Sequence, residues 1–309
     1  MRWYAVKGEA VLKSRFFKEQ LGKIVVSFFG IFIIIITLAI TVFLFVQGSA
    51  TFMVHGNNII TFLFGSYWDP SIVTKNNHQV GSGIFIVGSL VVSLLAILFA
   101  TPLALAVALF TTEVSPKLGK RLIQPAVEIF VGIPSVVYGW VGVMVLCPFI
   151  ANVFGLVFGG QSILAAAIVL TLMIFPTIAS VSTDALRSVP RKYKEASYAL
   201  GATRAQMMWK VNIPAAFPGI LTGIILGLAR AFGEALAVSM VLGGRLSFPN
   251  GLLSQTATLT TQIASAMGIA VNGTELTDSV WSMALLLFII SFLLILAIRV
   301  VTKKKKEDR

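Results

Sequence analysis

Residues 195–214 read EASYALGATRAQMMWKVNIP, a polar and basic stretch between two long apolar segments. The residues on either side of Gly201 are good helix formers, whereas Gly201 itself permits a reversal of the backbone. Pro214 suits the start of the next apolar segment, because proline is tolerated in the first turn of a helix. The stretch therefore predicts a helix, a turn and a second helix between two apolar segments.

This stretch carries more apolar side chains than a solvated surface needs. They are Tyr198, Leu200, Met207, Met208 and Trp209. Methionine and aromatic residues are typical of surfaces that dock another protein. The alternative is a loop that lies on the membrane with its basic residues against lipid headgroups. The residues alone leave both interpretations open.

The composition of the whole chain is that of an integral membrane protein. Its 309 residues are 57% hydrophobic and only 12% charged, and the mean hydropathy is +0.92. The net charge of +12 comes from Lys and Arg clusters between apolar runs, as expected for membrane orientation, so we expect no nucleic-acid partner. Cys147 is the only cysteine, and His55 and His78 are isolated, so we expect no disulfide within the chain and no metal site.

Six apolar runs are long enough to cross a bilayer, which predicts an all-α integral membrane protein with six transmembrane helices. The runs are residues 24–46, 84–110, 125–150, 162–183, 215–243 and 280–301. The first run is longer than the core of a signal peptide, so we interpret it as an uncleaved span.

Lys and Arg gather in alternate loops, which places both termini in the cytoplasm. The loop before the second run has Lys75 as its only Lys or Arg and should be external. The expected organisation is a cytoplasmic N-terminal segment, residues 1–23, then a six-helix transmembrane domain, residues 24–301. Within that domain a cytoplasmic loop lies at about residues 184–214, and a basic cytoplasmic tail, residues 302–309, follows it.

The fifth run contains Gly219, Gly223, Gly227, Arg230 and Glu234. On one continuous helix these five residues fall within about 80° of each other. Small residues at this spacing let another helix approach closely, so we expect the glycines to serve helix packing. The charged pair should face a partner helix or a pathway, because a charge that faces lipid is costly.

Arg230 and Glu234 have two interpretations that the sequence leaves open. They could neutralise each other across one helical turn and fasten the bundle. They could instead line a substrate pathway, where the guanidinium group would match an oxyanion. A carboxylate in that pathway suits an anion that carries a proton, as monohydrogen phosphate does and sulfate does not. Glu128, about one turn inside the third run, is a further residue with either a pathway role or a structural one.

The chain has no nucleotide-binding motif of the form G-x-x-x-x-G-K-[ST]. No loop is long enough to hold an enzyme domain. We therefore expect a chain that is not an enzyme and binds no cofactor itself, so any dependence on ATP must come from a partner.

The opening stretch resembles the EAA motif of ABC importer permeases. That motif is Glu-Ala-Ala, three residues, Gly, nine residues and Ile-x-Leu-Pro. The matching residues here are Glu195, Ala196, Ser197, Gly201, Ile213 and Pro214. In that family the loop forms a coupling helix that inserts into a groove on a cytoplasmic ATPase, and the resemblance implies the same role here.

Two further stretches resemble the phosphate permeases of ABC importers. They are residues 132–142, GIPSVVYGWVG, and residues 227–244, GLARAFGEALAVSMVLGG. The similarity extends over about residues 81–298, and the second stretch resembles the PstC-type subunit more than its PstA-type partner. The resemblance implies a type I ABC importer permease fold, also called MetI-like.

The same resemblance implies that the chain imports inorganic phosphate across a bacterial cytoplasmic membrane by alternating access. The implied partners are a homologous second permease subunit in a heterodimer, a cytoplasmic ATPase dimer that binds ATP and Mg, an extracytoplasmic phosphate-binding protein and membrane lipid. Selectivity in such importers lies largely in the binding protein, so a permease for sulfate, molybdate or another oxyanion is the first alternative.

Two alternatives come from other classes of membrane protein. A proton-coupled secondary carrier would use Glu234 and Glu128 as titrating groups, but the sequence lacks the inverted repeat with paired broken helices that such carriers often show. A membrane scaffold or sensor would gain little from buried charge on a packing face, so Arg230 and Glu234 argue against it.

Overall fold

A computed structural model of the chain describes residues 2–74, 77–156, 159–271 and 273–307. Six helical segments in this part of the chain are long and apolar enough to cross a membrane. They are Gly22–Met53, Gly83–Val114, Ser135–Phe154, Ile163–Ser188, Arg204–Gly233 and Glu275–Val300. The predicted all-α fold with six membrane spans is confirmed.

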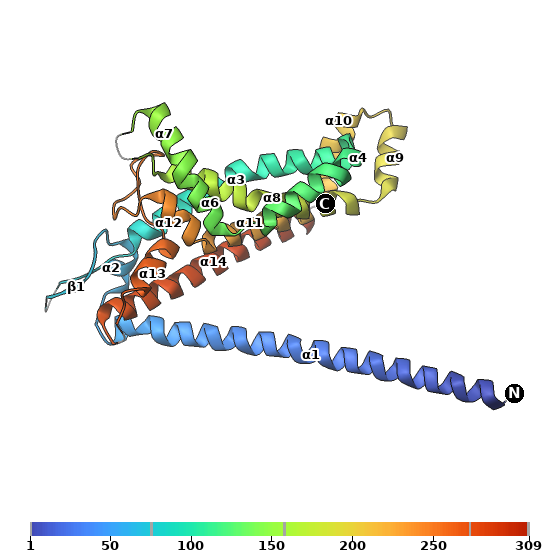
Figure 1. The fold of residues 1–309 in the computed structure, drawn as a ribbon, viewed down its shortest axis with the longest axis horizontal. Helices are drawn as coiled ribbons and strands as arrows, with labels where there is room; N and C mark the ends of the chain where they lie inside the picture. The colour runs from blue at the N-terminus through green and yellow to red at the C-terminus, as the bar shows by residue number, and fades with distance from the viewer. Residues whose placement is uncertain (1, 75–76, 157–158, 272, 308–309) are drawn as a thin grey trace.

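The first and last helices lie at the edge of the molecule. Helix α1, Arg2–Met53, is unbroken, so the domain boundary expected after residue 23 is not a break in the helix. It extends away from the other helices and meets the start of α14, Glu275–Glu307, only near its own C-terminal end (Figure 1). There the rings of Phe43 and Trp281 pack edge to face, 5.1 Å apart.

Between α1 and the second span lie a short helix and a β-hairpin, where the sequence predicted only a loop. The helix is α2, Ile59–Phe64, and the antiparallel strands are β1, Trp68–Thr74, and β2, Asn77–Val80. Lys75, which contributed to the predicted topology, lies outside the described residues. We call this side of the bundle the hairpin end.

Helices α3, Gly83–Leu109, and α8, Ile163–Ser188, form the centre of the bundle. Fully buried alanines on α3 belong to the same core as those on α8, which include Ala165 and Ala166. Small side chains allow two helix backbones to approach closely, which explains why these helices share the core. Helix α11, Ile213–Gly233, packs against both α8 and α3.

The third span differs from its prediction. Residues 125–150 were expected to form one helix, but the chain forms α5, Gln124–Gly132, and then α6, Ser135–Val141. Ile133 and Pro134 between them are extended, since a residue that precedes proline disfavours the helical conformation. The span therefore begins at Ser135. It continues through the π-helical segment η3, Gly142–Leu146, and α7, Cys147–Phe154.

The fifth span is also interrupted. The single helix expected over residues 215–243 is divided into α11 and α12, Leu236–Leu242. Glu234 at the division has ψ of 120°, which is extended backbone. The following segment contains α13, Leu259–Met267.

The remaining elements lie at the opposite side of the bundle from the hairpin, which we call the loop end. They are η1, Phe110–Val114, α4, Pro116–Leu118, η2, Gly119–Ile123, α9, Arg191–Ala199, α10, Arg204–Met207, and η4, Met208–Asn212. Helix α1 begins and α14 ends toward this same end (Figure 1).

Candidate functional site

Residues 191–212, which we call the EAA loop, form the expected helix, turn and helix. Gly201 joins the two helices with φ of +78°, a conformation that side chains with a Cβ rarely adopt. Thr203 then caps α10, and Gln206 completes the capping box. Segments α10 and η4 continue into α11 without a gap. Pro214 is the second residue of α11 and causes no break where the π-helical segment η4 passes into α11.

The residues of the EAA motif differ in their exposure to solvent. Glu195, Ala196 and Gly201 are exposed, whereas Ser197 is buried. Ile213 and Pro214 are half-buried at the start of α11. The first part of the motif therefore faces mostly outward, whereas its last residues join the loop to the bundle.

Large apolar side chains of the loop point outward. Leu200 is 88% exposed and Trp209 66% exposed, and Tyr198 is also exposed. Met207 was expected on the same surface, but it is only 1% exposed and belongs to the interior. An exposed apolar patch beside basic residues is suited to a protein partner.

Glu113 holds the EAA loop against the bundle, and sequence analysis did not identify it. Glu113 lies in η1, directly after the apolar helix α3, and it is only 7% exposed. Its Oε1 atom accepts hydrogen bonds from Lys194 Nζ at 2.5 Å and Asn212 Nδ2 at 2.8 Å. The sequence signal was a single acidic residue followed by the basic segments at the loop end.

The break between α11 and α12 separates Arg230 from Glu234. Because Glu234 lies beyond the last turn of α11, the prediction that both charges share one helix face was wrong. Arg230 Nη1 donates to Thr177 Oγ1 at 3.2 Å, and Glu234 Oε1 accepts the N–H of Ala237 at 3.0 Å. Within the described chain no ion pair joins the two side chains. The mutual neutralisation considered above therefore does not occur in this structure, and each side chain is oriented by another partner.

Buried hydroxyl groups surround Glu234, and these residues too were missed. Thr260 Oγ1 donates to the backbone carbonyl of Glu234 at 2.9 Å and lies 3.1 Å from Thr258 Oγ1. Ser89 and Ser93 of α3 line the same small cavity. The threonine-rich sequence TATLTT at residues 256–261 was the available signal. The cavity at the break thus combines the Glu234 carboxylate with several hydroxyl groups, and Arg230 lies one turn earlier on α11 with its guanidinium group on Thr177.

Gly219, Gly223 and Gly227 lie where α11 contacts α8. A Cβ added to Gly219 would lie 2.5 Å from the Cβ of Ala185, and one added to Gly227 would lie 2.8 Å from side-chain atoms of Ile178. A Cβ added to Gly223 would lie 3.2 Å from the Cβ of Val181 and 3.3 Å from the carbonyl oxygen of Ile178, which is a looser contact. The three glycines therefore allow a separation of α8 and α11 that larger residues would prevent.

Glu128 does not lie inside the third span, as had been expected. It belongs to α5, before the break at Pro134, and is exposed. Its Oε1 atom accepts a hydrogen bond from Gln124 Nε2 at 3.2 Å. Glu128 lines a cavity at the loop end together with Asp184 and Arg187, and this cavity is separate from the break that holds Arg230.

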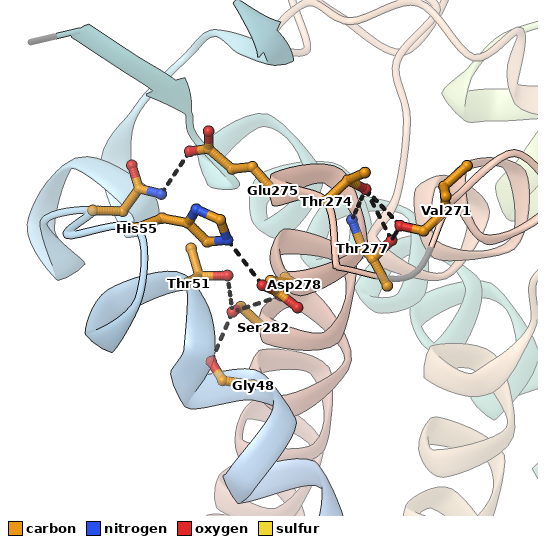
Figure 2. A network of polar contacts seen from close by, with 10 residues as sticks. Gly48, Thr51, His55, Val271, Thr274, Glu275, Thr277, Asp278 and Ser282 are labelled. Carbon is orange, nitrogen blue, oxygen red and sulfur yellow. Dashed lines mark hydrogen bonds and ion pairs between the residues drawn. The ribbon is translucent and has the colours of Figure 1, made fainter. Parts of the chain in front are cut away.

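No group of three or more His, Cys, Asp and Glu side chains that could hold a metal occurs among the described residues. His55 instead pairs with Asp278, with 2.8 Å between Nε2 and Oδ2, and Asn57 donates to Glu275 at 2.9 Å. Figure 2 shows these contacts joining the segment that follows α1 to α14 at the hairpin end. They attach that segment to a helix rather than form a ligand site.

Comparison with known proteins gives relatives over nearly the full length. "Probable ABC transporter permease protein YqgH" of Bacillus subtilis (strain 168) is 45% identical over 294 residues, which cover 95% of this chain and 94% of that protein. "Phosphate transport system permease protein PstC" of Pasteurella multocida (strain Pm70) is 31% identical and covers 94% of each chain. The PstC protein of Mesorhizobium japonicum is 35% identical over 76% of each chain.

Among solved structures, the inward-facing MetNI methionine ABC transporter matches with a TM-score of 0.54 and 24% identity. The match covers 70% of this chain and 92% of that chain, and it shows a shared type I importer permease fold. Residues 100–307 match the family described as "Binding-protein-dependent transport system inner membrane component". The chain is therefore a multi-pass membrane protein that belongs to this family, the permease subunits of ABC importers.

Proposed function

We propose that this chain is a PstC-type permease subunit that carries inorganic phosphate into a bacterial cell. The observation that carries the proposal is the state of Arg230, whose guanidinium group contacts the neutral hydroxyl of Thr177 and no carboxylate among the described residues. Its positive charge is therefore available to an anion. The relatives named phosphate transport permeases support phosphate as that anion.

Glu234 favours an oxyanion that carries a proton. Its Oε1 atom caps α12, and within the described residues Oε2 has no hydrogen-bond partner. A free carboxylate oxygen would accept a hydrogen bond from monohydrogen phosphate, whereas sulfate has no proton to donate at neutral pH. The hydroxyl groups of Thr258 and Thr260 line the same cavity, but both already donate within the protein, to Thr261 Oγ1 and to the Glu234 carbonyl respectively. The free acceptor on Glu234 therefore supports phosphate over sulfate.

Energy for transport would come from a partner. In this proposal the EAA loop lies in the cytoplasm and docks onto an ATPase dimer, which binds ATP and Mg, and both termini are cytoplasmic. Leu200 and Trp209 supply the apolar part of that contact. A homologous second permease subunit completes a heterodimeric pore, and an extracytoplasmic phosphate-binding protein delivers the substrate to the hairpin end. ATP-driven closure of the ATPase then changes access to the break between α11 and α12.

The test is ATP-dependent uptake of labelled phosphate into proteoliposomes that hold this chain with its second permease, ATPase and binding protein. We expect uptake that requires ATP and persists in excess sulfate. Arg230→Ala should remove uptake while all subunits still co-purify, whereas Arg299→Ala, an exposed arginine on α14, should leave it unchanged. ATP hydrolysis without phosphate uptake would move the substrate to another oxyanion.

A further inference from the structure

Glu113 is a buried charged residue at the loop end that substrate binding does not use. It lies at the end of the second span, whereas its partners come from both halves of the EAA loop. Lys194 belongs to α9, Asn212 to η4, and both donate to the same carboxylate oxygen. Arg204 of α10 also donates to the backbone carbonyl of Glu113.

These contacts fix the whole loop and not one side chain. Buried carboxylates persist when they are paired and hydrogen-bonded, and Glu113 satisfies both conditions. Because its donors lie on both sides of the Gly201 turn, the loop cannot move as a unit without moving Glu113 or breaking these bonds. Ion pairs exposed to solvent would yield more easily, but the Glu113 side chain is only 9% exposed.

The other end of α3 reaches the candidate substrate site. Ser89, near the start of α3, accepts the N–H of Leu259, the first residue of α13, at 2.9 Å. The next residue, Thr260, donates to the carbonyl of Glu234. Helix α3 therefore contacts the EAA loop at one end and the surroundings of Glu234 at the other.

We propose that Glu113 is a positioning residue that couples the EAA loop to α3. The loop would then act on the substrate site along two connections. One is the continuous chain through η4 and α11, and the other runs from Glu113 through α3 and α13. A chain of packed and hydrogen-bonded elements is the physical form that such coupling takes. This inference rests on the proposed function, because it concerns how ATPase movement reaches the transported anion.

The measurement is the number of phosphate ions imported per ATP hydrolysed by the complete complex in proteoliposomes. Glu113→Gln keeps the shape of the side chain but removes its charge, and Lys194→Gln removes the partner's charge. We expect both variants to hydrolyse ATP and to import about 2- to 30-fold less phosphate per ATP, the range for residues that carry coupling.

Two controls separate coupling from folding. Lys192→Gln changes an exposed lysine two positions away, whose ammonium lies 5.5 Å from the Tyr193 ring, and should leave the ratio unchanged. Exchange of the charges in Glu113→Lys with Lys194→Glu should restore most of the lost coupling. The same exchange with Lys192→Glu in place of Lys194→Glu should not.

Either of two results would overturn the inference. One is a normal ratio in Glu113→Gln. The other is an equal loss of ATP hydrolysis and of phosphate uptake in Glu113→Gln that the charge exchange does not restore. That result would show that Glu113 only stabilises the structure. Failure of the proposed function is distinguishable, because the unmodified complex would then import no phosphate. The ratio can in that case be measured with the oxyanion that the complex does import.

Discussion

Helices α1 and α8 are both apolar enough to cross a membrane, but their surroundings are opposite. The mean hydropathy of the spanning window is 3.0 in α1 and 2.3 in α8, yet 0% of that window is buried in α1 and 67% in α8. Helix α8 buries both alanines and large side chains such as Met173 and Ile178, whereas α1 presents large side chains such as the run Ile33–Ile36 outward. Hydropathy places a segment in the membrane, but it does not show which segments are surrounded by other helices of the same chain.

Removal of a large buried side chain should give the largest difference between the two helices. Ile178 of α8 is 0% exposed, whereas Ile33 of α1 is 63% exposed. We expect Ile178→Ala to lower stability by about 2–5 kcal/mol, and Ile33→Ala to change it by less than about 0.5 kcal/mol. Thermal unfolding of the detergent-solubilised chain, followed by size-exclusion chromatography, measures both. Equal losses in the isolated chain would remove the distinction between α1 and α8.

A large side chain in place of a glycine should lower stability at the surface of α8 but not at the surface of α1. Gly219→Leu would force α11 away from Ala185 of α8, and overpacking of this kind costs about 1–3 kcal/mol. Gly30→Leu in α1 is the matched control, since no atom lies within 4 Å of its added Cβ. The yield and melting temperature of each purified variant give the result. If Gly30→Leu is harmless in the isolated chain but blocks assembly of the complex, α1 packs against another subunit.

Removal of a threonine hydroxyl group should reduce transport when the threonine belongs to α8 but not when it belongs to α1. Thr177→Val removes the hydrogen bond to Arg230, and bonds to charged groups contribute about 1.5–3 kcal/mol. If that bond orients the guanidinium group, uptake should fall by about tenfold or more while assembly is preserved. In α1, Thr37 only contacts the Ile33 carbonyl within its own helix, so Thr37→Val should leave uptake unchanged. Normal uptake in Thr177→Val would show that Arg230 needs no support from α8.

The smallest expected effect lies where α1 joins the bundle. Ser282 Oγ of α14 is within 2.7 Å of both the Gly48 carbonyl oxygen and Thr51 Oγ1 (Figure 2). Ser282→Ala should therefore lower stability by about 1 kcal/mol. Ser291→Ala, farther along α14, is the control and should have a smaller effect. No difference between the two variants would mean that the polar contacts at the hairpin end do not hold α1.

The predictable parts of the structure depend on local signals. The six spans follow from apolar length, and the turn of the EAA loop follows from Gly201, which needs a positive φ. The break in the third span could have been read from Pro134, because the preceding residue disfavours a helix. That signal was present, and the expectation of one continuous helix ignored it.

The remaining features depend on residues far apart in the chain. The partner of Arg230 is Thr177, 53 positions away, and the donors to Glu113 are 81 to 99 positions away. Glu234 could have continued α11, but its carboxylate caps α12 and its carbonyl accepts from Thr260. Helix periodicity contains no information about such contacts, so the prediction that Arg230 and Glu234 share one helix face was wrong.

The unbroken run from Arg204 to Gly233 has a mechanical consequence. Arg204 and Arg230 lie 26 residues apart on it, so at about 1.5 Å per residue they are separated by roughly 39 Å along the axis. A tilt of only about 5° around one end would displace the other by roughly 3 Å over that length. This displacement is comparable with the 3.2 Å between Arg230 and Thr177. A lever of this length would convert a slight rotation at the EAA loop into the making or breaking of a contact at the proposed substrate site.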